Sequence, residues 1–309
     1  MNPKTLYDVI IIGGGPAGLS AAIYSCRNRA KTLIIEKGLM GGMINETEKL
    51  DNYPGFPDGI SGMELTSLMY QQAQKYGLED TNDTVLAIKP GPSGHFDVTT
   101  SEGKFTAKAV IVSSGSDKQK MDVPGEKEFT GRGVAYCATC DAPFYKDKHV
   151  AVVGGGDTAL YEALHLAKFA SKVTVIHRRG EFRATPFVQE QARKDTKIEF
   201  LMDSVVEAVE GQQFVEKLMI KNVSSGKKSE LPVDGVFVAI GLIPNTGYLK
   251  GLAELDGQGM VVVNDHMESS VPGIFAAGDI RHNSIRQVVS AAADGAIAAV
   301  NAKHRIDQS

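Results

Sequence analysis

Two of the three cysteines in the chain lie three residues apart, at Cys137 and Cys140, and Asp141 follows them directly. A CxxC pair is compatible with a redox-active dithiol, with half of a zinc site, or with a turn that has no chemistry. A structural zinc site needs four ligands, and the only other cysteine, Cys26, falls in the pattern of a buried helix. We therefore favour a redox pair, in which Asp141 shuttles the proton that accompanies thiol exchange.

Composition limits the classes of protein that could carry such a pair. The chain has 309 residues, 42% of them hydrophobic, and a formal net charge of −4, which is long enough for two domains and gives no basic field for nucleic acid. We find neither a secretory signal pattern nor an apolar run approaching the roughly 20 residues that cross a bilayer. We expect a cytoplasmic protein that binds neither nucleic acid nor membrane.

The residues that could serve the cysteine pair lie in two glycine-rich repeats. Residues 7–27 read as an apolar strand, a turn with Gly13, Gly15 and Gly18, and a helix, which is the pattern of a dinucleotide site. Residues 148–169 repeat this layout, with glycines at 154 and 156 and Ala159 as the last member of the motif. Because one match would be weak evidence and two are stronger, the sequence predicts two dinucleotide sites.

The strand after each turn indicates which nucleotide is bound. It reaches Glu36 in the first repeat and His177 in the second, in each case 23 residues after the first glycine of the turn. A carboxylate there suits a ribose with a free 2′-hydroxyl, as in FAD or NAD. In the second repeat the acid is replaced by His177, Arg178 and Arg179, with Arg183 nearby, and these cations suit the 2′-phosphate of NADPH.

A third stretch, residues 270–302, predicts a return of the chain to the first site, with Asp279 placed to bind a ribityl hydroxyl at the start of a helix. We therefore predict an α/β fold with two Rossmann-like domains. The NADPH domain, residues 116–243, carries the CxxC motif and is inserted into an FAD domain made of residues 1–115 and 244–309. The two joins, near residues 113–115 and 241–244, are candidate hinges for rigid-body rotation.

These sites together suggest an electron path from NADPH to FAD, then to the Cys137–Cys140 disulfide, and from there to an oxidised client. Two alternatives remain open. One is a flavin disulfide reductase that takes electrons from ferredoxin or another donor, and the other is an oxidase of small dithiols. No metal site is expected.

Six motifs, in order and over essentially the whole length, resemble those of the low-molecular-weight bacterial thioredoxin reductases: GGGPAGLSAAIY, CATCD, GGGDTA, HRRGEFRA, FVAIGLIPNT and GIFAAGDI. The resemblance implies a homodimeric FAD enzyme that transfers electrons from NADPH to thioredoxin. It also implies that Cys140 lies against the flavin, that Cys137 attacks the thioredoxin disulfide, and that Asp141 donates the proton. Thioredoxin would dock near Arg132 and Phe144.

The same resemblance implies a set of cofactor-binding positions. FAD would be held by Gly13, Gly15, Ala17, Gly18, Glu36, Gly42, Asn52, Asp279, Arg286 and Gln287. NADPH would be held by Gly156, Asp157, Thr158, His177, Arg178, Arg179, Arg183 and Ile240. The chain departs from the usual family residues at Met43, Ser113–Ser114, Pro143 and Tyr161–Glu162.

Overall fold

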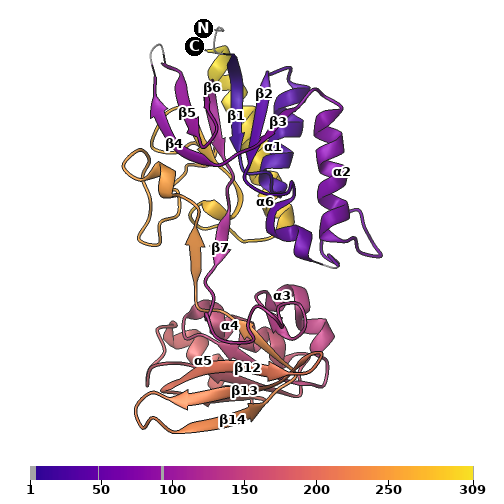
Figure 1. The fold of residues 1–309 in the computed structure, drawn as a ribbon, viewed down its shortest axis with the longest axis vertical. Coiled ribbons are helices and arrows are strands. Elements are labelled where there is room, and N and C mark those ends of the chain that lie inside the picture. The colour runs from indigo at the N-terminus through magenta and orange to yellow at the C-terminus, as the bar shows by residue number, and fades with distance from the viewer. Residues whose placement is uncertain (1–4, 48, 92–93, 309) are drawn as a thin grey trace. The chain divides into compact units, whose positions relative to one another are not determined.

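The computed structural model describes residues 5–47, 49–91 and 94–308. The chain forms two compact units, one of residues 1–117 with 243–309 and one of residues 118–242 (Figure 1). It passes between them in β7 (Ser116–Lys118) and β16 (Leu242–Pro244), which pair with each other. None of the helices in the described ranges has the length and apolar character needed to cross a lipid bilayer.

The first unit is built on a mixed sheet with the strand order β3-β2-β1-β6-β5-β4, in which β17 also pairs with β6. The pairings β1–β2, β1–β6, β2–β3 and β6–β17 are parallel. Besides β7 and β16, the elements of this unit are, in chain order, β1 (Leu6–Ile12), α1 (Pro16–Arg27), β2 (Thr32–Glu36), η1 (Gly42–Glu46), α2 (Gly62–Gln74), β3 (Glu79–Asn82), β4 (Val85–Pro90), β5 (Phe96–Thr100), β6 (Lys104–Val112), η4 (Gly247–Leu249), β17 (Ile274–Ala276), η5 (Gly278–Ile280) and α6 (Val288–Asp307).

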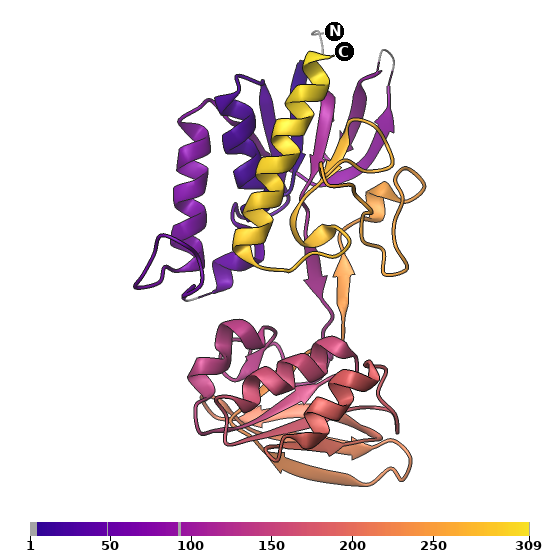
Figure 2. The same ribbon diagram turned by 180° about the vertical axis from the view of Figure 1, so that it is seen from behind.

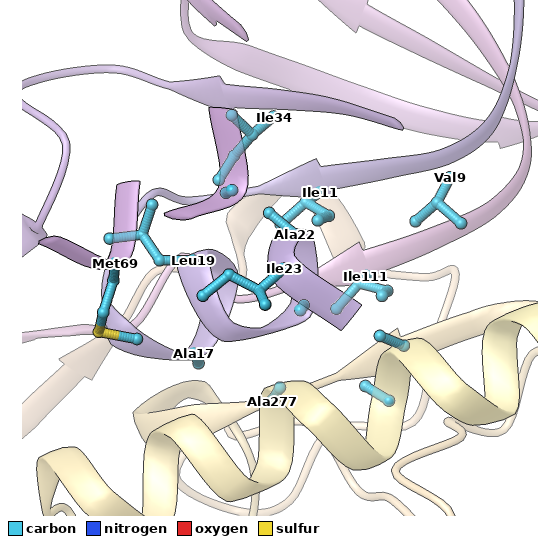
Figure 3. Close-up of a cluster of buried hydrophobic side chains, with 14 of the residues drawn as sticks. Val9, Ile11, Ala17, Leu19, Ala22, Ile23, Ile34, Met69, Ile111 and Ala277 are labelled. Carbon is cyan, nitrogen blue, oxygen red and sulfur yellow. The ribbon is translucent and has the colours of Figure 1, made fainter. Parts of the chain in front are cut away.

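Alternation along the strands of the first unit separates two cores. Side chains such as Val9 and Ile11 on β1 face α1, α2 and α6, whereas Ile10 and Ile12 face the opposite layer. Figure 3 shows the helix-side cluster, with Val9 and Ile11 near Ile111 and the helix residues Leu19 and Ala22. The long helix α6 runs beside α1 over this face (Figure 2).

The second unit repeats this plan on a smaller scale. Its parallel sheet has the order β11-β10-β9-β15-β8, and a separate antiparallel sheet has the order β12-β13-β14. Its elements are β8 (Val134–Ala135), α3 (Ala138–Asp141), η3 (Ala142–Tyr145), β9 (His149–Val153), α4 (Asp157–Ala167), β10 (Lys172–Ile176), α5 (Pro186–Lys194), β11 (Ile198–Leu201), β12 (Ser204–Gly211), β13 (Val215–Asn222), β14 (Lys228–Pro232) and β15 (Gly235–Val238).

Here too the central strand supplies both cores. Val150 and Val152 of β9 pack with α4, whereas Ala151 packs with residues of β12 and β13 on the opposite face. The predicted α/β fold class is confirmed. The antiparallel β12–β14 sheet, which covers one face of the parallel sheet, was not among the predicted elements.

The packing of α6 on α1 depends on one small residue. A Cβ atom on Gly295 of α6 would overlap the carbonyl oxygen of Ala17 on α1, and Ser20 of α1 donates to the carbonyl of Ala292 at 2.6 Å. The two helices therefore approach as closely as their backbones allow.

We expect Gly295→Ala to destabilise the protein, although alanine favours a helix by about 1 kcal/mol over glycine. Overpacking against a backbone atom costs about 1–3 kcal/mol, so the net sign should be a loss. The measurement is the free energy of unfolding in urea. His304→Ala, at an exposed α6 position, is the control and should cause no loss. An increase in stability for Gly295→Ala would contradict the packing described here.

Candidate functional site: two glycine turns and a cysteine pair

The first glycine turn is fixed by contacts within the chain. The Gly13 amide donates to the carbonyl of Ile35 at 2.8 Å, its φ is 102°, and a Cβ on it would overlap the Ser113 carbonyl oxygen. A Cβ on Gly18 would overlap the carbonyl oxygen of Gly13. Both positions therefore require glycine for packing, and they bring the start of α1 to the carboxyl end of β1.

Gly15 and Gly156, at the N-caps of α1 and α4, have a different role. The nearest atom to a Cβ on Gly15 would lie 3.9 Å away, and nothing lies within 4 Å of one on Gly156. Packing within the chain therefore does not explain these glycines. Each leaves open space over a helix N-terminus, where backbone amides and the helix dipole favour a phosphate. The two turns fit the diphosphate groups of dinucleotide cofactors.

Glu36, at the end of β2, lies beside the first turn as the spacing predicts. It is buried, with 9% of its surface exposed, and its carboxylate accepts hydrogen bonds from the amides of Gly14 at 2.6 Å and Gly38 at 2.8 Å. These donors fix the orientation of the carboxylate. A carboxylate so held can still accept bonds from a ribose, because each oxygen has two lone pairs.

The loop at Gly41–Gly42 reaches the same turn from the other side. The Gly41 amide donates to the Gly14 carbonyl at 2.8 Å, and both loop glycines have positive φ, 111° and 62°. A Cβ on Gly42 would lie 3.4 Å from the Cα of Gly15. Gly42 is thereby placed against the first glycine turn, while the neighbouring Met43 side chain is exposed.

The C-terminal stretch returns to α1. A Cβ on Gly278 would lie 2.9 Å from that of Ala17, so Asp279 is next to the helix that follows the first turn. Asp279 accepts a hydrogen bond from the Ser284 hydroxyl at 3.3 Å. Gln287 is the N-cap residue of α6. Its side-chain oxygen accepts a hydrogen bond from the Asn52 side-chain amide at 3.0 Å. The preceding residue, Arg286, has a positive φ of 61°.

An ion pair that was not among the predicted features holds this stretch in place. Asp294 of α6, with 6% of its side chain exposed, accepts from Arg281 at 2.6 and 3.0 Å and from the Gly278 amide at 3.1 Å. This buried carboxylate fixes η5 against α6. The available signal was an acid within segment 288–300, whose only other polar side chain is Ser290, because a buried charge requires a partner.

The second turn shows a buried histidine where the sequence suggested a cationic donor. His177 is 5% exposed, its ring stacks on Phe182 at 5.4 Å, and a Cβ on Gly155 would collide with it. Its Nε2 is 3.1 Å from the Glu181 carbonyl. Burial is the main cause that lowers the pKa of His177; the bond to the Glu181 carbonyl raises it, and the nearby arginines lower it further.

The positive charge at this turn comes from the arginines. Arg178, Arg179 and Arg183 are exposed, and the Arg183 amide donates to the Gly155 carbonyl at 2.8 Å. This bond joins the basic loop to the glycine turn. Asp157 accepts two bonds from Thr185, at 2.8 and 2.9 Å. Thr158 is exposed at the start of α4, and Ile240 is partly buried after β15.

The cysteine pair forms a disulfide at the start of α3. The Cα atoms of Cys137 and Cys140 lie 5.4 Å apart and the sulfurs are bonded. Cys137 is the N-cap residue, and its Sγ accepts from the Cys140 amide at 3.3 Å. Asp141 ends the helix. Cys26 is a free, buried thiol. Among the described residues no group of three or more metal-ligating side chains is found.

Two residues predicted to dock a client lie in the same unit as the disulfide. Phe144 of η3 is 58% exposed. The exposed Arg132 donates to the Glu128 carbonyl at 2.6 Å, and its guanidinium lies 5.8 Å from the centre of the Phe129 ring. Both side chains are open to solvent.

Comparison with known proteins agrees with these features. Residues 7–295 match the model of a family described as pyridine nucleotide-disulphide oxidoreductase. The chain is 46% identical to a thioredoxin reductase of Treponema pallidum, over 98% of each chain, and 42% identical to one of Bacillus subtilis, over 100% and 97%. A thioredoxin reductase structure from Streptococcus pyogenes superposes with a TM-score of 0.92 at 41% identity, covering 99% of this chain and 100% of that one.

The chain therefore belongs to the pyridine nucleotide-disulphide oxidoreductases, a family of enzymes that combine a dinucleotide with a redox-active disulfide. Within that family it groups with the thioredoxin reductases, whose cofactors are FAD and NADPH. The resemblance that the sequence motifs indicated is confirmed.

Removing Asp294 should destabilise the first unit. Asp294→Ala leaves Arg281, whose side chain is only 16% exposed, without its carboxylate partner, and breaking a buried pair costs about 3–5 kcal/mol. We expect a loss of this size in the free energy of unfolding. The matched control is Glu199→Ala, which breaks the exposed ion pair with Lys172 and should cost about 0–1 kcal/mol. Equal effects of the two changes would contradict a structural role for Asp294.

Proposed function

We propose that this protein is an NADPH-dependent thioredoxin reductase in which the Cys137–Cys140 disulfide passes electrons to oxidised thioredoxin. The observation that carries the proposal is the bonded cysteine pair at the start of α3, in the unit that also contains the basic glycine turn. The full-length similarity to thioredoxin reductases supports it.

We assign FAD to the first unit and NADPH to the second. The open helix N-terminus at Gly15 and the fixed carboxylate of Glu36 support FAD in the first. The open N-terminus at Gly156 and the exposed arginines support NADPH in the second. The residues assigned to FAD are Gly13, Gly15, Ala17, Gly18, Glu36, Gly42, Asn52, Asp279, Arg286 and Gln287. Those assigned to NADPH are Gly156, Asp157, Thr158, His177, Arg178, Arg179, Arg183 and Ile240.

When bound, the flavin supplies hydride acceptance from NADPH and delivery of an electron pair to the disulfide. The chain's own residues do the rest. Reduction breaks the bond between Cys137 and Cys140, and two protons complete the two thiols. We assign Asp141, which follows Cys140 directly, to the transfer of a proton. Cys137 then attacks the client disulfide, and Cys140 displaces the reduced client as the disulfide forms again.

We further propose thioredoxin docking at Arg132 and Phe144, a homodimer, and a cytoplasmic location. Phe144 offers an exposed aromatic anchor, and Arg132 a positive charge for polar contacts. Exposed apolar side chains on α1 and α6, among them Tyr24, Ile297 and Val300, support a self-association surface. The dithiol needs reduced nucleotide to regenerate it, which supports the cytoplasm.

Nucleotide choice should depend on the basic loop. A hydrogen bond to a charged group contributes about 1.5–3 kcal/mol, so Arg178→Ala combined with Arg179→Ala, which removes two such donors, should raise the KM for NADPH by roughly tenfold or more. The KM for NADH should change by less than about threefold, because NADH has no 2′-phosphate. Lys194→Ala, on the exposed end of α5, is the control. Equal losses for NADPH and NADH would contradict the assignment.

Thioredoxin reduction should require the cysteine pair. Cys140→Ser removes one sulfur of the disulfide and should abolish NADPH-driven reduction of thioredoxin. Cys26→Ser, at the buried free cysteine, should retain it. Both variants are assayed by the appearance of thioredoxin thiols. Activity retained in Cys140→Ser would indicate a thiol-free flavoprotein, and a wild-type enzyme active only with ferredoxin would indicate a different electron donor.

A further inference from the structure

Glu162 lies on α4 beneath the helix that carries the redox cysteines. The backbone amide of Ala138, the first residue of α3, faces this carboxyl group and lowers its pKa. Ala138 and Ala142 are buried in one cluster with Ala159 and Ala163 of α4, so α3 rests directly on α4. The carboxyl group is therefore held at the first turn of α3, where Cys137 is the N-cap.

One oxygen of this carboxyl group has no partner. Within the described ranges, Glu162 Oε2 is one of two buried side-chain oxygen or nitrogen atoms without a hydrogen bond. A buried, unpaired carboxylate oxygen is unfavourable, and protonation of the group relieves the cost. Burial is the main cause that raises the pKa of Glu162 to about 7. Asp141 raises it further, and Lys118 and the Ala138 amide lower it.

The charged groups around Glu162 come from few elements. Asp141 faces it from α3 and Lys118 from β7. Tyr145 lies on η3, which also packs against α4, and its pKa is raised to about 12 by burial, Asp141 and Asp234. His165, nearly one turn further along α4, has its pKa lowered by burial and by Lys168. On the other elements packed against α4, the Arg193 guanidinium of α5 lies over the Phe200 ring, and His149 of β9 lies 2.9 Å from the Thr174 hydroxyl. Lys172 of β10 contacts Glu199 of β11, and Lys194 of α5 contacts Glu190.

Reduction of the disulfide changes the charge above this carboxyl group. Two electrons and two protons convert the pair to two thiols, and loss of one proton then gives the thiolate that attacks a client. That thiolate and an ionised Glu162 are like charges at the same turn. Like charges disfavour each other's ionised form, and the two groups titrate as a coupled pair.

We propose that Glu162 is a positioning residue that controls how readily the reduced Cys137–Cys140 pair ionises. While Glu162 holds a proton, the thiols are free to form the attacking thiolate. Once Glu162 is ionised, its negative charge opposes that thiolate. This role differs from that of Asp141, which we assign to proton transfer, and it rests on the proposed disulfide chemistry.

The test compares wild-type holoenzyme with Glu162→Gln, in which glutamine imitates the protonated acid. Each protein is reduced anaerobically with a phosphine and treated with iodoacetamide, and mass spectrometry follows alkylation of Cys137 and Cys140 separately. At pH 6 the variant and the wild type should react at nearly equal rates, because Glu162 of the wild type is mostly protonated at this pH and the glutamine cannot ionise. At pH 8.5 Glu162 is ionised only in the wild type. The variant should then react at least about threefold faster at one of the two cysteines, which corresponds to half a pKa unit.

Two further variants complete the experiment. Glu199→Gln, a neutralised carboxylate on β11 of the same unit, should match the wild type at both pH values. Glu162→Asp keeps an ionisable group one methylene shorter and should lie between the wild type and Glu162→Gln at pH 8.5. It also serves if Glu162→Gln fails to retain FAD. Cys26 is an internal control, because burial raises the pKa of its thiol.

A rate ratio between Glu162→Gln and wild type that is the same at pH 6 and pH 8.5 would overturn the inference. So would a Glu162→Asp protein that reacts as fast as Glu162→Gln at pH 8.5, because the shorter acid still carries the negative charge. Chemical reduction and alkylation use neither NADPH nor thioredoxin. A failure of this inference is therefore separable from a failure of the proposed function, which would appear as absent thioredoxin reduction in the wild type.

Discussion

The structure depends on a close backbone approach that occurs twice, once at the end of each central parallel strand. The Gly13 amide donates to the Ile35 carbonyl at 2.8 Å, and the Gly154 amide donates to the Ile176 carbonyl at 3.0 Å. A side chain at either glycine would overlap the carbonyl oxygen of a neighbouring strand-end residue. Because both glycines permit this approach, the following helix starts at the carboxyl edge of its sheet, with its amides open to a phosphate.

The two glycine turns share this backbone geometry but differ in the side chains that lie beside them. The first turn has a carboxylate held by two amides, and the second has a buried histidine that supports the turn while exposed arginines carry the charge. The charge beside the turn is thus negative in the first unit and positive in the second, and it comes from different residues at or next to equivalent positions of the two units. The disulfide lies in the unit with the basic turn, and the acid Glu162 is packed beneath it. Cofactor choice and thiol chemistry therefore depend on separate residues of that unit.

Much of this organisation could be predicted from the sequence, because the signals are local. The glycine spacing, the equal distance to Glu36 and His177, and the CxxC pair each lie within a short segment. Contacts between segments that are distant in the sequence could not be predicted in this way. The pairing of Arg281 with Asp294 and the contact of Glu162 with the start of α3 depend on how helices pack. The burial of His177 against Gly155 likewise followed only from the fold, since the HRR run predicts cations but not which of them faces solvent.

The account is tested most directly by following the flavin without oxygen. The purified holoenzyme is mixed first with NADH and then with NADPH, and the flavin absorbance is recorded before and after oxidised thioredoxin is added. We predict rapid bleaching by NADPH, much slower bleaching by NADH, and recovery of the absorbance when thioredoxin is added. Absence of bleaching by either nucleotide would contradict the assignment of the second glycine turn. Bleaching by NADPH without recovery on thioredoxin would contradict the proposed role of the Cys137–Cys140 disulfide.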